Sequence, residues 1–98
     1  MKKKIIVMDV VSGTSTNAEG YSLFVVMKKA ITNNDKIVLC MKGCTPMSSS
    51  FLNSSIGALI DDFGLKTIKG RLLISDATPS MAGNITNYLT RYKRILQK

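Results

Sequence analysis

The sequence predicts an α/β fold, a small sandwich in which a mostly parallel sheet packs against helices in the order β-α-β-α-β-α. Two observations predict this class. Runs rich in β-branched and aliphatic residues alternate with longer segments whose apolar residues recur at helical spacing. Clusters of Gly, Ser, Thr, Asn and Asp separate these segments. Strands that alternate with helices form parallel sheets, because each helix carries the chain back to the same end of the sheet.

The first strand and the first helix are predicted from the first third of the chain. The run "KKKIIVMDVV" is rich in β-branched residues and predicts a strand over Lys4–Val10. The turn residues "SGTSTNAEG" follow, and a helix is predicted over Asn17–Ile31. One side of this helix is expected to carry Tyr21, Phe24, Val25, Lys28 and Ile31.

The middle of the chain predicts a buried strand and a second helix. The run "KIVLCM", Lys36–Met41, is almost continuously apolar, which is typical of a central strand buried on both faces. Pro46 disfavours helical geometry at the residue before it, so the second helix is expected to begin after Pro46 and to end at Gly64. Its apolar positions are Phe51, Leu52, Ile56, Leu59, Ile60 and Phe63.

The last third of the chain predicts the third strand and the third helix. "RLLI", Arg71–Ile74, reads as a strand, with "KTI" before it as a short extended piece. Thr78 is the predicted N-cap of the last helix and Pro79 its first residue. The apolar stripe of this helix is Met81, Ile85, Tyr88, Leu89, Tyr92, Ile95 and Leu96. The opposite face is expected to hold Asn84, Asn87, Arg91, Arg94 and Lys98.

Length and charge indicate the class of protein. The 98 residues fit one domain over residues 1–98, and the net charge of +8 at pH 7 predicts an acidic partner. "MKKKIIVM" imitates the start of a signal peptide, but Asp9 interrupts the apolar run. Neither a signal peptide nor a membrane span is therefore predicted, and a cytoplasmic location without membrane contact is expected.

The residue types exclude several kinds of site. The sequence holds no His, which excludes His-based acid–base catalysis and the Ser-His-Asp arrangement. Cys40 and Cys44 are the only cysteines, and two thiolates alone make an incomplete metal site. No metal and no cofactor are therefore expected. Cys40 is predicted to be buried and inert, and Cys44 to be the more reactive thiol, because a nearby helix N-terminus lowers a thiol's pKa.

Three consecutive serines, Ser48–Ser50, stand at the start of the predicted second helix in "TPMSSSFLNSSIGALI". One serine, Ser48 or Ser49, is enough to cap the helix, and Ser50 is then expected to point outward. A helix N-terminus also favours a phosphate or a carboxylate. From the residues alone the run is therefore either capping chemistry or a place where an anion is bound or attached.

The segment "KIVLCMKGCTPMSSSFLNSSIGALIDDFG" resembles the central motif of the STAS-like family of unknown function. The matching residues are Ser49, Ser50, Phe51, Leu52, Asn53, Ile56, Gly57 and Leu59. The strand and helix before the motif and those after it match the family in outline, so the resemblance covers most of the chain. It implies a STAS-like fold and a regulatory, protein-binding role.

The same run is more distantly similar to STAS domains of anti-sigma-factor antagonists, whose motif is Asp-Ser-Ser-Gly-Leu. Their second Ser, which is phosphorylated by a histidine-kinase-like ATPase, falls on Ser50. Ser48 replaces the motif's Asp and Phe51 its Gly, so the resemblance favours binding over phosphorylation. It implies a partner surface at Ser49, Ser50 and Asn53, with Ser50 as candidate phosphoacceptor. The implied partner is a histidine-kinase-like ATPase or an anti-sigma-like factor.

Two other classes of function are open from the residues. Nucleic acid is the alternative partner, bound through Arg91, Arg94 and Lys98 of the last helix. An enzyme would need Ser50 or Cys44 as nucleophile and a Lys or Asp as base. The carboxylates available to it are Asp9, Asp61, Asp62 and Asp76. The expected function is binding rather than catalysis.

Overall fold

Three parallel strands form one sheet in the computed structural model, which describes residues 2–44 and 47–96, with side chains up to Arg91. Strand β1 (Lys2–Ile6) lies beside β2 (Lys36–Cys40), and β2 lies beside β3 (Leu72–Ser75). Both pairs are parallel. The predicted α/β class, the parallel sheet and the central place of "KIVLCM" are therefore confirmed.

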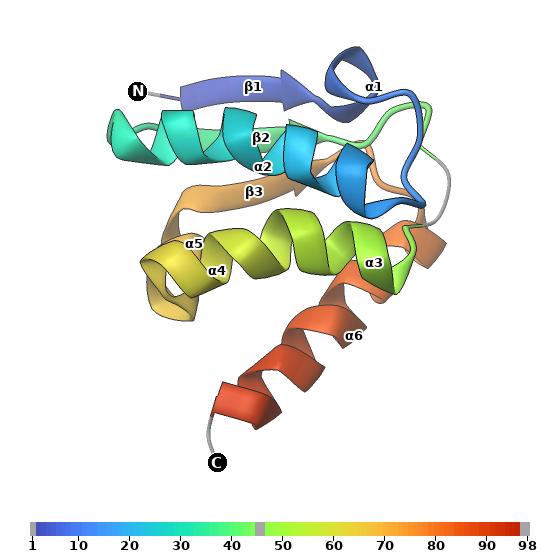
Figure 1. Cartoon of the computed structure of the whole chain (residues 1–98). Coiled ribbons are helices and arrows are strands. Elements are labelled where there is room, and N and C mark those ends of the chain that lie inside the picture. The colour runs from blue at the N-terminus through green and yellow to red at the C-terminus, as the bar shows by residue number, and fades with distance from the viewer. Residues whose placement is uncertain (1, 45–46, 97–98) are drawn as a thin grey trace.

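The helices lie on one side of this sheet, as Figure 1 shows for the long α2 and for α4 and α5 beneath the strands. The helical elements are α1 (Val7–Val10), α2 (Asn17–Thr32), α3 (Ser49–Leu52), the π-helical η1 (Asn53–Gly57), α4 (Ala58–Phe63), α5 (Leu65–Arg71) and α6 (Pro79–Leu96). Elements α3, η1 and α4 follow one another without a break and together form the second helix that the sequence predicts.

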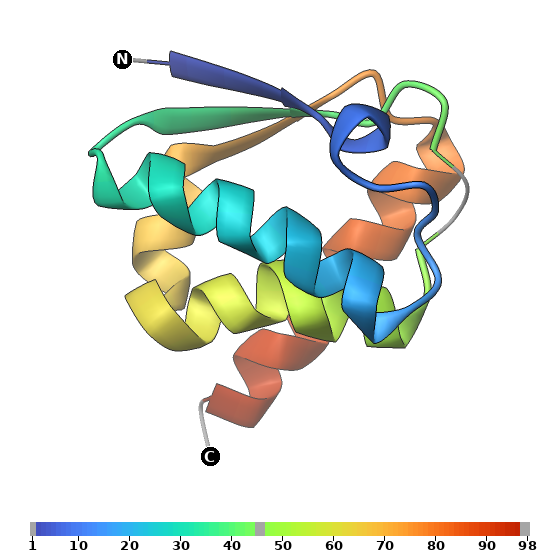
Figure 2. The ribbon, with the colours of Figure 1, turned by 45° about the horizontal axis from the view of Figure 1, so that its top comes forward.

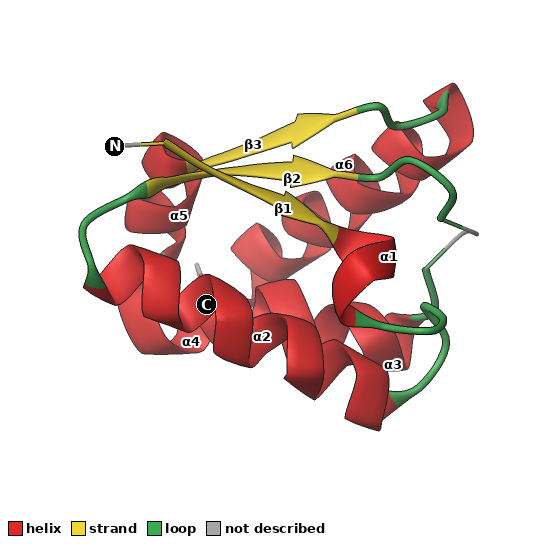
Figure 3. Ribbon diagram, turned by 90° about the horizontal axis from the view of Figure 1, so that it is seen from above, coloured by secondary structure: helices red, strands yellow, loops and turns green. Residues whose placement is uncertain are grey.

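The two faces of the sheet differ because only the inner one is covered by helices (Figure 3). Ile5, Leu39 and Ile74 form one cross-strand row on the inner face, where Ile5 and Leu39 are fully buried. The next row, Lys4, Val38 and Leu73, faces outward, and Leu73 is 52% exposed. Val38 is consequently only half-buried, so the prediction that the central strand is covered on both faces is wrong at this residue.

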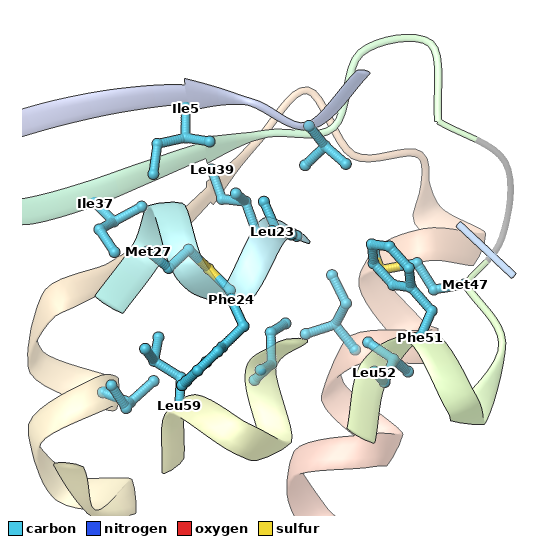
Figure 4. Packing of buried hydrophobic residues seen from close by; sticks show 14 of the residues in the cluster. Ile5, Leu23, Phe24, Met27, Ile37, Leu39, Met47, Phe51, Leu52 and Leu59 are labelled. Atoms are coloured by element: carbon cyan, nitrogen blue, oxygen red, sulfur yellow. The ribbon is translucent and has the colours of Figure 1, made fainter. Parts of the chain in front are cut away.

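The core fills the space between the inner face and the helices (Figure 4). Its aliphatic side chains come from the strands, from α2 and from the continuous helix formed by α3, η1 and α4, which we call the rod. Phe51 is the largest fully buried member of the core. Every apolar position predicted for the second helix is buried except Phe63, which is half-buried. The helical spacing therefore identified this face correctly.

The buried side of α2 differs in part from the predicted one. Phe24 and Ile31 are buried as expected, but Tyr21 and Val25 are 60% and 47% exposed. The residues that face the core are Gly20, Leu23, Phe24, Met27, Ala30 and Ile31. Tyr21 instead packs on the ring of Phe24 at the surface, with ring centroids 5.9 Å apart.

The predicted first strand is wrong in its second half. The chain leaves the sheet after Ile6 and makes the helical turn α1, which the Val11 N–H closes by donating to the Val7 carbonyl at 3.0 Å. Val7 and Val11 are both buried, so the turn places two β-branched side chains in the core. Asp9 lies exposed on this turn rather than at a strand end.

The chain between the second helix and β3 is helical, so the predicted extended piece at "KTI" is wrong. Gly64 ends α4 with φ of 88°, a left-handed conformation that glycine adopts without strain, and the chain then re-enters a helix as α5. Ile68 of α5 is buried, which explains why this short segment folds against the core.

Helix α6 begins where the sequence predicts. The Met81 N–H donates to the Thr78 hydroxyl at 3.2 Å, which confirms Thr78 as the cap and Pro79 as the first residue. Met81 and Ile85 are buried, and Leu89 is half-buried. The side chains of Tyr92, Ile95 and Leu96, which complete the predicted stripe, lie outside the described residues.

Candidate functional site

Ser48 caps the rod formed by α3, η1 and α4. Its backbone is extended, with φ of −73° and ψ of 161°, and its hydroxyl oxygen accepts from the Phe51 N–H at 3.1 Å. The same hydroxyl donates to the Ser15 carbonyl at 2.9 Å. The prediction that Ser48 or Ser49 caps this helix is therefore confirmed, with Ser48 as the cap.

The loop before α2 is fastened to the serine run at this point, and Figure 2 shows the two segments side by side. The Ser48 N–H donates to the Thr14 carbonyl at 3.1 Å, and Thr14 is buried. The sequence marks "SGTSTN" as a turn after the first strand, but only the fold shows that it forms the wall beside Ser48.

Glu19 holds this loop in shape. It forms a capping box with Thr16 and accepts hydrogen bonds from the Ser12 hydroxyl and the Ser15 N–H. These bonds, that from the Thr16 side chain above all, lower the pKa of Glu19. Because the folded pKa is the lower one, the carboxylate stabilises the loop at neutral pH, and this contribution is lost as pH falls through the lowered pKa.

The three predicted contact residues do not share one direction. Ser49, Ser50 and Asn53 are all exposed, so the expectation that Ser50 points outward is confirmed. Ser49 and Asn53, which lie four residues apart on one side of the rod, line a pocket. Ser50 does not line it, because each residue turns by about 100° around a helix.

This pocket has a volume of about 270 Å³ and lies between the start of α3 and the middle of α6. Met47 and Leu52 supply its apolar surface, and both are buried. Its polar lining comes from Ser49, Asn53, Asn84, Tyr88 and Arg91. We refer to it below as the α3–α6 pocket.

Two polar side chains of α6 organise the α3–α6 pocket. The Tyr88 hydroxyl donates to Asn53 Oδ1 at 2.8 Å, and burial raises the pKa of Tyr88, so this hydroxyl keeps its proton at neutral pH. Asn84 Oδ1 is buried without a hydrogen-bond partner among the described residues. A buried acceptor without a donor is rare in native proteins.

Asn84 and Tyr88 are functional candidates that the sequence did not single out. The helical pattern placed Asn84 on the solvent face, which is wrong, since it is half-buried against the α3–α6 pocket. Tyr88 belongs to the predicted apolar stripe, but its hydroxyl reaches out of the core to Asn53. A helical pattern separates buried from exposed positions and carries no signal for the boundary between two helices.

The alternative nucleic-acid residues lie only partly within the described structure. Arg91 is exposed and lines the α3–α6 pocket, so it stands beside Ser49 and Asn53. The side chains of Arg94 and Lys98 lie outside the described residues. The structure thus joins one residue of the alternative site to two residues of the first.

The cysteines lie at and just after the carboxyl end of the central strand β2. Cys40 is buried and its thiol donates to Asp76 Oδ2 at 3.2 Å, a bond that lowers the pKa of Asp76. Cys44 is half-buried, and this burial raises the pKa of its thiol. The predicted lowering by a helix N-terminus is therefore wrong for Cys44. Residues 2–44 and 47–96 hold no cluster of three or more metal-ligating side chains.

Comparison with known proteins gives a family and no individual relative. None of the described helices combines the length and the apolar character needed to cross a membrane. The searches of curated proteins and of solved structures returned no match. A model of the STAS-like domain of unknown function (DUF4325) matches residues 20–82, from α2 to the start of α6, which is more than half of the chain. The chain therefore belongs to this family of STAS-like domains.

Proposed function

We propose that this protein is a non-enzymatic regulatory module that binds a partner protein through the start of α3. The observation that carries the proposal is the α3–α6 pocket, where Ser49 and Asn53 stand beside Arg91 and beside Asn84 Oδ1, which has no hydrogen-bond partner among the described residues. The resemblance to anti-sigma-factor antagonists supports a histidine-kinase-like ATPase or an anti-sigma-like factor as the partner.

The chemistry of the pocket favours an acidic or amide-bearing group of the partner. Asn84 Oδ1 has no donor among the described residues, so a hydrogen-bond donor of the partner fits it, and leaving a buried acceptor unpaired costs about 1–3 kcal/mol. Arg91 offers a cation at the mouth of the same pocket. Met47 and Leu52 add apolar surface on which the stem of such a side chain packs. The protein's net charge of +8 favours acidic partners further.

Ser50 supplies a means of control beside this contact. It is exposed in the first turn of α3, next to pocket residue Ser49. Phosphorylation would add negative charge there, which the helix N-terminus tolerates but an acidic partner does not. Ser50 is therefore the candidate phosphoacceptor, and its modification is expected to release the partner.

Binding fits the available groups better than catalysis does. The sequence has no His, and Asp61 and Asp62 are exposed at the end of α4, where Asp62 pairs with Lys28 at 3.0 Å. The carboxylate of Asp76 accepts hydrogen bonds from the Cys40 thiol and the Ser75 hydroxyl, so its hydrogen bonds are with neither candidate nucleophile, Ser50 or Cys44. These placements support a protein that recognises a partner without turning over a substrate.

Quantitative pull-downs from a host lysate test the proposal. The bait variants are Asn84→Ala, Arg91→Gln and Ser50→Asp. The matched controls are Asn87→Ala and Ser80→Asp, which change exposed residues of α6 outside the pocket. A partner retained by the wild type and by both controls, and lost by at least about tenfold with all three site variants, is the expected result.

The proposal fails if the site variants retain the same proteins as the wild type while remaining folded in thermal unfolding. Nuclease treatment separates the alternative function. If nuclease removes everything that the wild type captures, the basic surface binds nucleic acid instead, and the protein-binding proposal is overturned.

A further inference from the structure

A second and larger pocket lies at the amino-terminal edge of the sheet, at the opposite end of the strands from Ser48. Its volume is about 580 Å³. Figures 1 and 3 show that the three strands begin at this end and that α5 lies beside it. The lining residues are Lys2, Asn34, Lys36, Lys66, Thr67, Gly70 and Arg71. We refer to it as the edge pocket, and it shares no residue with the α3–α6 pocket.

The fold gathers four cations around the edge pocket from separate parts of the chain. Lys2 and Lys36 are direct cross-strand neighbours at the starts of β1 and β2. Arg71 immediately precedes β3, whose Leu72 pairs with Ile37, so Arg71 continues the row beside Lys36. Neighbouring strands lie about 4.8 Å apart. Lys66 joins the row from α5.

These four cations have no paired counter-charge among the described residues. No acidic side chain of the described chain lines the edge pocket, and none of the four forms an ion pair with a described residue. The neighbouring carboxylate, Asp35, lines a different pocket with Lys3 and Lys29. Like charges directly opposite each other in a sheet destabilise it, so an anion that enters the edge pocket removes a cost already present.

We propose that the edge pocket binds a chain of phosphate groups, as found in inorganic polyphosphate or in the triphosphate of a nucleotide. A phosphate at the end of such a chain carries about −1.5 to −2 charges at pH 7, so a few linked phosphates match several converging cations. Asn34 and Thr67 add neutral donors to phosphate oxygens.

The residue types that line the edge pocket also disfavour some classes of ligand. No aromatic side chain among the described residues lines it, so a nucleobase finds no surface to stack on. The same reason disfavours single-stranded nucleic acid, whose binding sites combine cations with aromatic platforms. The phosphate chain alone is the recognised group, and the rest of its carrier contributes little.

Isothermal titration calorimetry at fixed ionic strength tests this proposal on the whole chain. The ligands are inorganic tripolyphosphate, ATP without magnesium, AMP and orthophosphate. Tripolyphosphate and ATP are expected to bind with Kd values within about threefold of each other, and AMP and orthophosphate at least about tenfold more weakly.

The variant pair Lys36→Gln with Lys66→Gln removes two cations of the edge pocket. It is expected to weaken tripolyphosphate binding at least about tenfold. The matched control is Lys29→Gln with Lys69→Gln, which removes the same charge from exposed lysines that do not line the pocket. This control is expected to change the Kd by less than about twofold.

Four results would each overturn the proposal. If the control pair weakens binding as much as the pocket pair, affinity follows net charge and not the edge pocket. If ATP binds far more tightly than tripolyphosphate, or if a single-stranded oligonucleotide binds more tightly than both with the same dependence on Lys36 and Lys66, the recognised group is not the phosphate chain. Absence of binding by the folded wild type also refutes it.

Discussion

At the scale of single residues, Ser48 determines how the serine run is built. Its hydroxyl accepts from the Phe51 N–H and donates to the Ser15 carbonyl, so one side chain caps the rod and joins it to the loop before α2. Ser49 and Ser50 are left free of capping and remain exposed. The three serines therefore have different roles, one as cap and two as exposed residues, because they occupy different positions around the first turn.

Replacing these serines by alanine separates their roles. Ser48→Ala is expected to lower the free energy of unfolding by about 1–2 kcal/mol, because the Phe51 N–H loses its acceptor. Ser50→Ala is expected to change it by less than about 0.5 kcal/mol, because Ser50 is exposed. Denaturant unfolding of both variants measures the difference. A larger loss for Ser50→Ala would show that Ser50 is structural and would remove the basis for a switch at this residue.

At the scale of elements, α2 and the rod approach each other closely at Gly20. A Cβ atom on Gly20 would stand 2.6 Å from the Phe51 carbonyl oxygen and 2.8 Å from Ser54 Cβ. The bond from the Ser54 hydroxyl to Asn17 Oδ1 at 2.9 Å also crosses this contact. Gly20 therefore sets the distance between the two helices that position the serine run.

Two glycine-to-alanine substitutions test the contact. Gly20→Ala is expected to destabilise the fold by about 1–3 kcal/mol, since backbone atoms must shift to admit the new methyl group. Gly83→Ala in α6 is the control, because a Cβ there meets nothing within 4 Å. The control is expected to gain up to about 1 kcal/mol from helix propensity. Thermal or denaturant unfolding measures both, and a stabilising Gly20→Ala would mean that the helices are not in close contact.

The elements that the sequence predicted correctly are those governed by neighbours along the chain. The cap at Ser48 or Ser49, the cap at Thr78 and the stop at Gly64 each depend on a few adjacent residues, and all three predictions are confirmed, with Ser48 as the first cap. The same holds for the alternating order of strands and helices, which local apolar patterns carry. The family motif likewise lies within one continuous segment, and its resemblance is confirmed by the match over residues 20–82.

The elements that the sequence did not predict depend on contacts between distant segments. Val7–Val10 has the composition of a strand, yet it makes a helical turn that buries Val7 in the core. Asn84 belongs to a pocket only because α6 passes the start of α3. The edge pocket likewise needs the register of the strands, since Lys2, Lys36 and Arg71 are far apart in sequence.

At the scale of the whole molecule, the charge is unevenly compensated. The net charge is +8, and the hydrogen bonds of the Glu19 and Asp76 carboxylates lie toward the carboxyl ends of the strands, away from the edge pocket. The radius of gyration is 12.2 Å, so every cation feels the others when ionic screening is weak. The cations of the edge pocket share one end of the sheet, where Lys2 and Lys36 are directly opposite each other, so they are expected to repel one another.

The stability of the folded protein is consequently expected to rise with sodium chloride. The screening length falls from about 30 Å at 0.01 M salt to about 3 Å at 1 M, which is shorter than the spacing of neighbouring strands. The Lys36→Gln, Lys66→Gln variant is expected to melt about 2–4 °C above the wild type at 0.01 M salt, because it loses about 0.5 kcal/mol of repulsion. At 1 M salt the two Tm values are expected to converge.

The Lys29→Gln, Lys69→Gln control should not gain stability at low salt, since Lys29 and Lys69 lie in the last turns of α2 and α5, where a cation is favourable. If the control gains as much as the pocket variant, repulsion is spread evenly over the molecule and the edge pocket holds no concentrated charge.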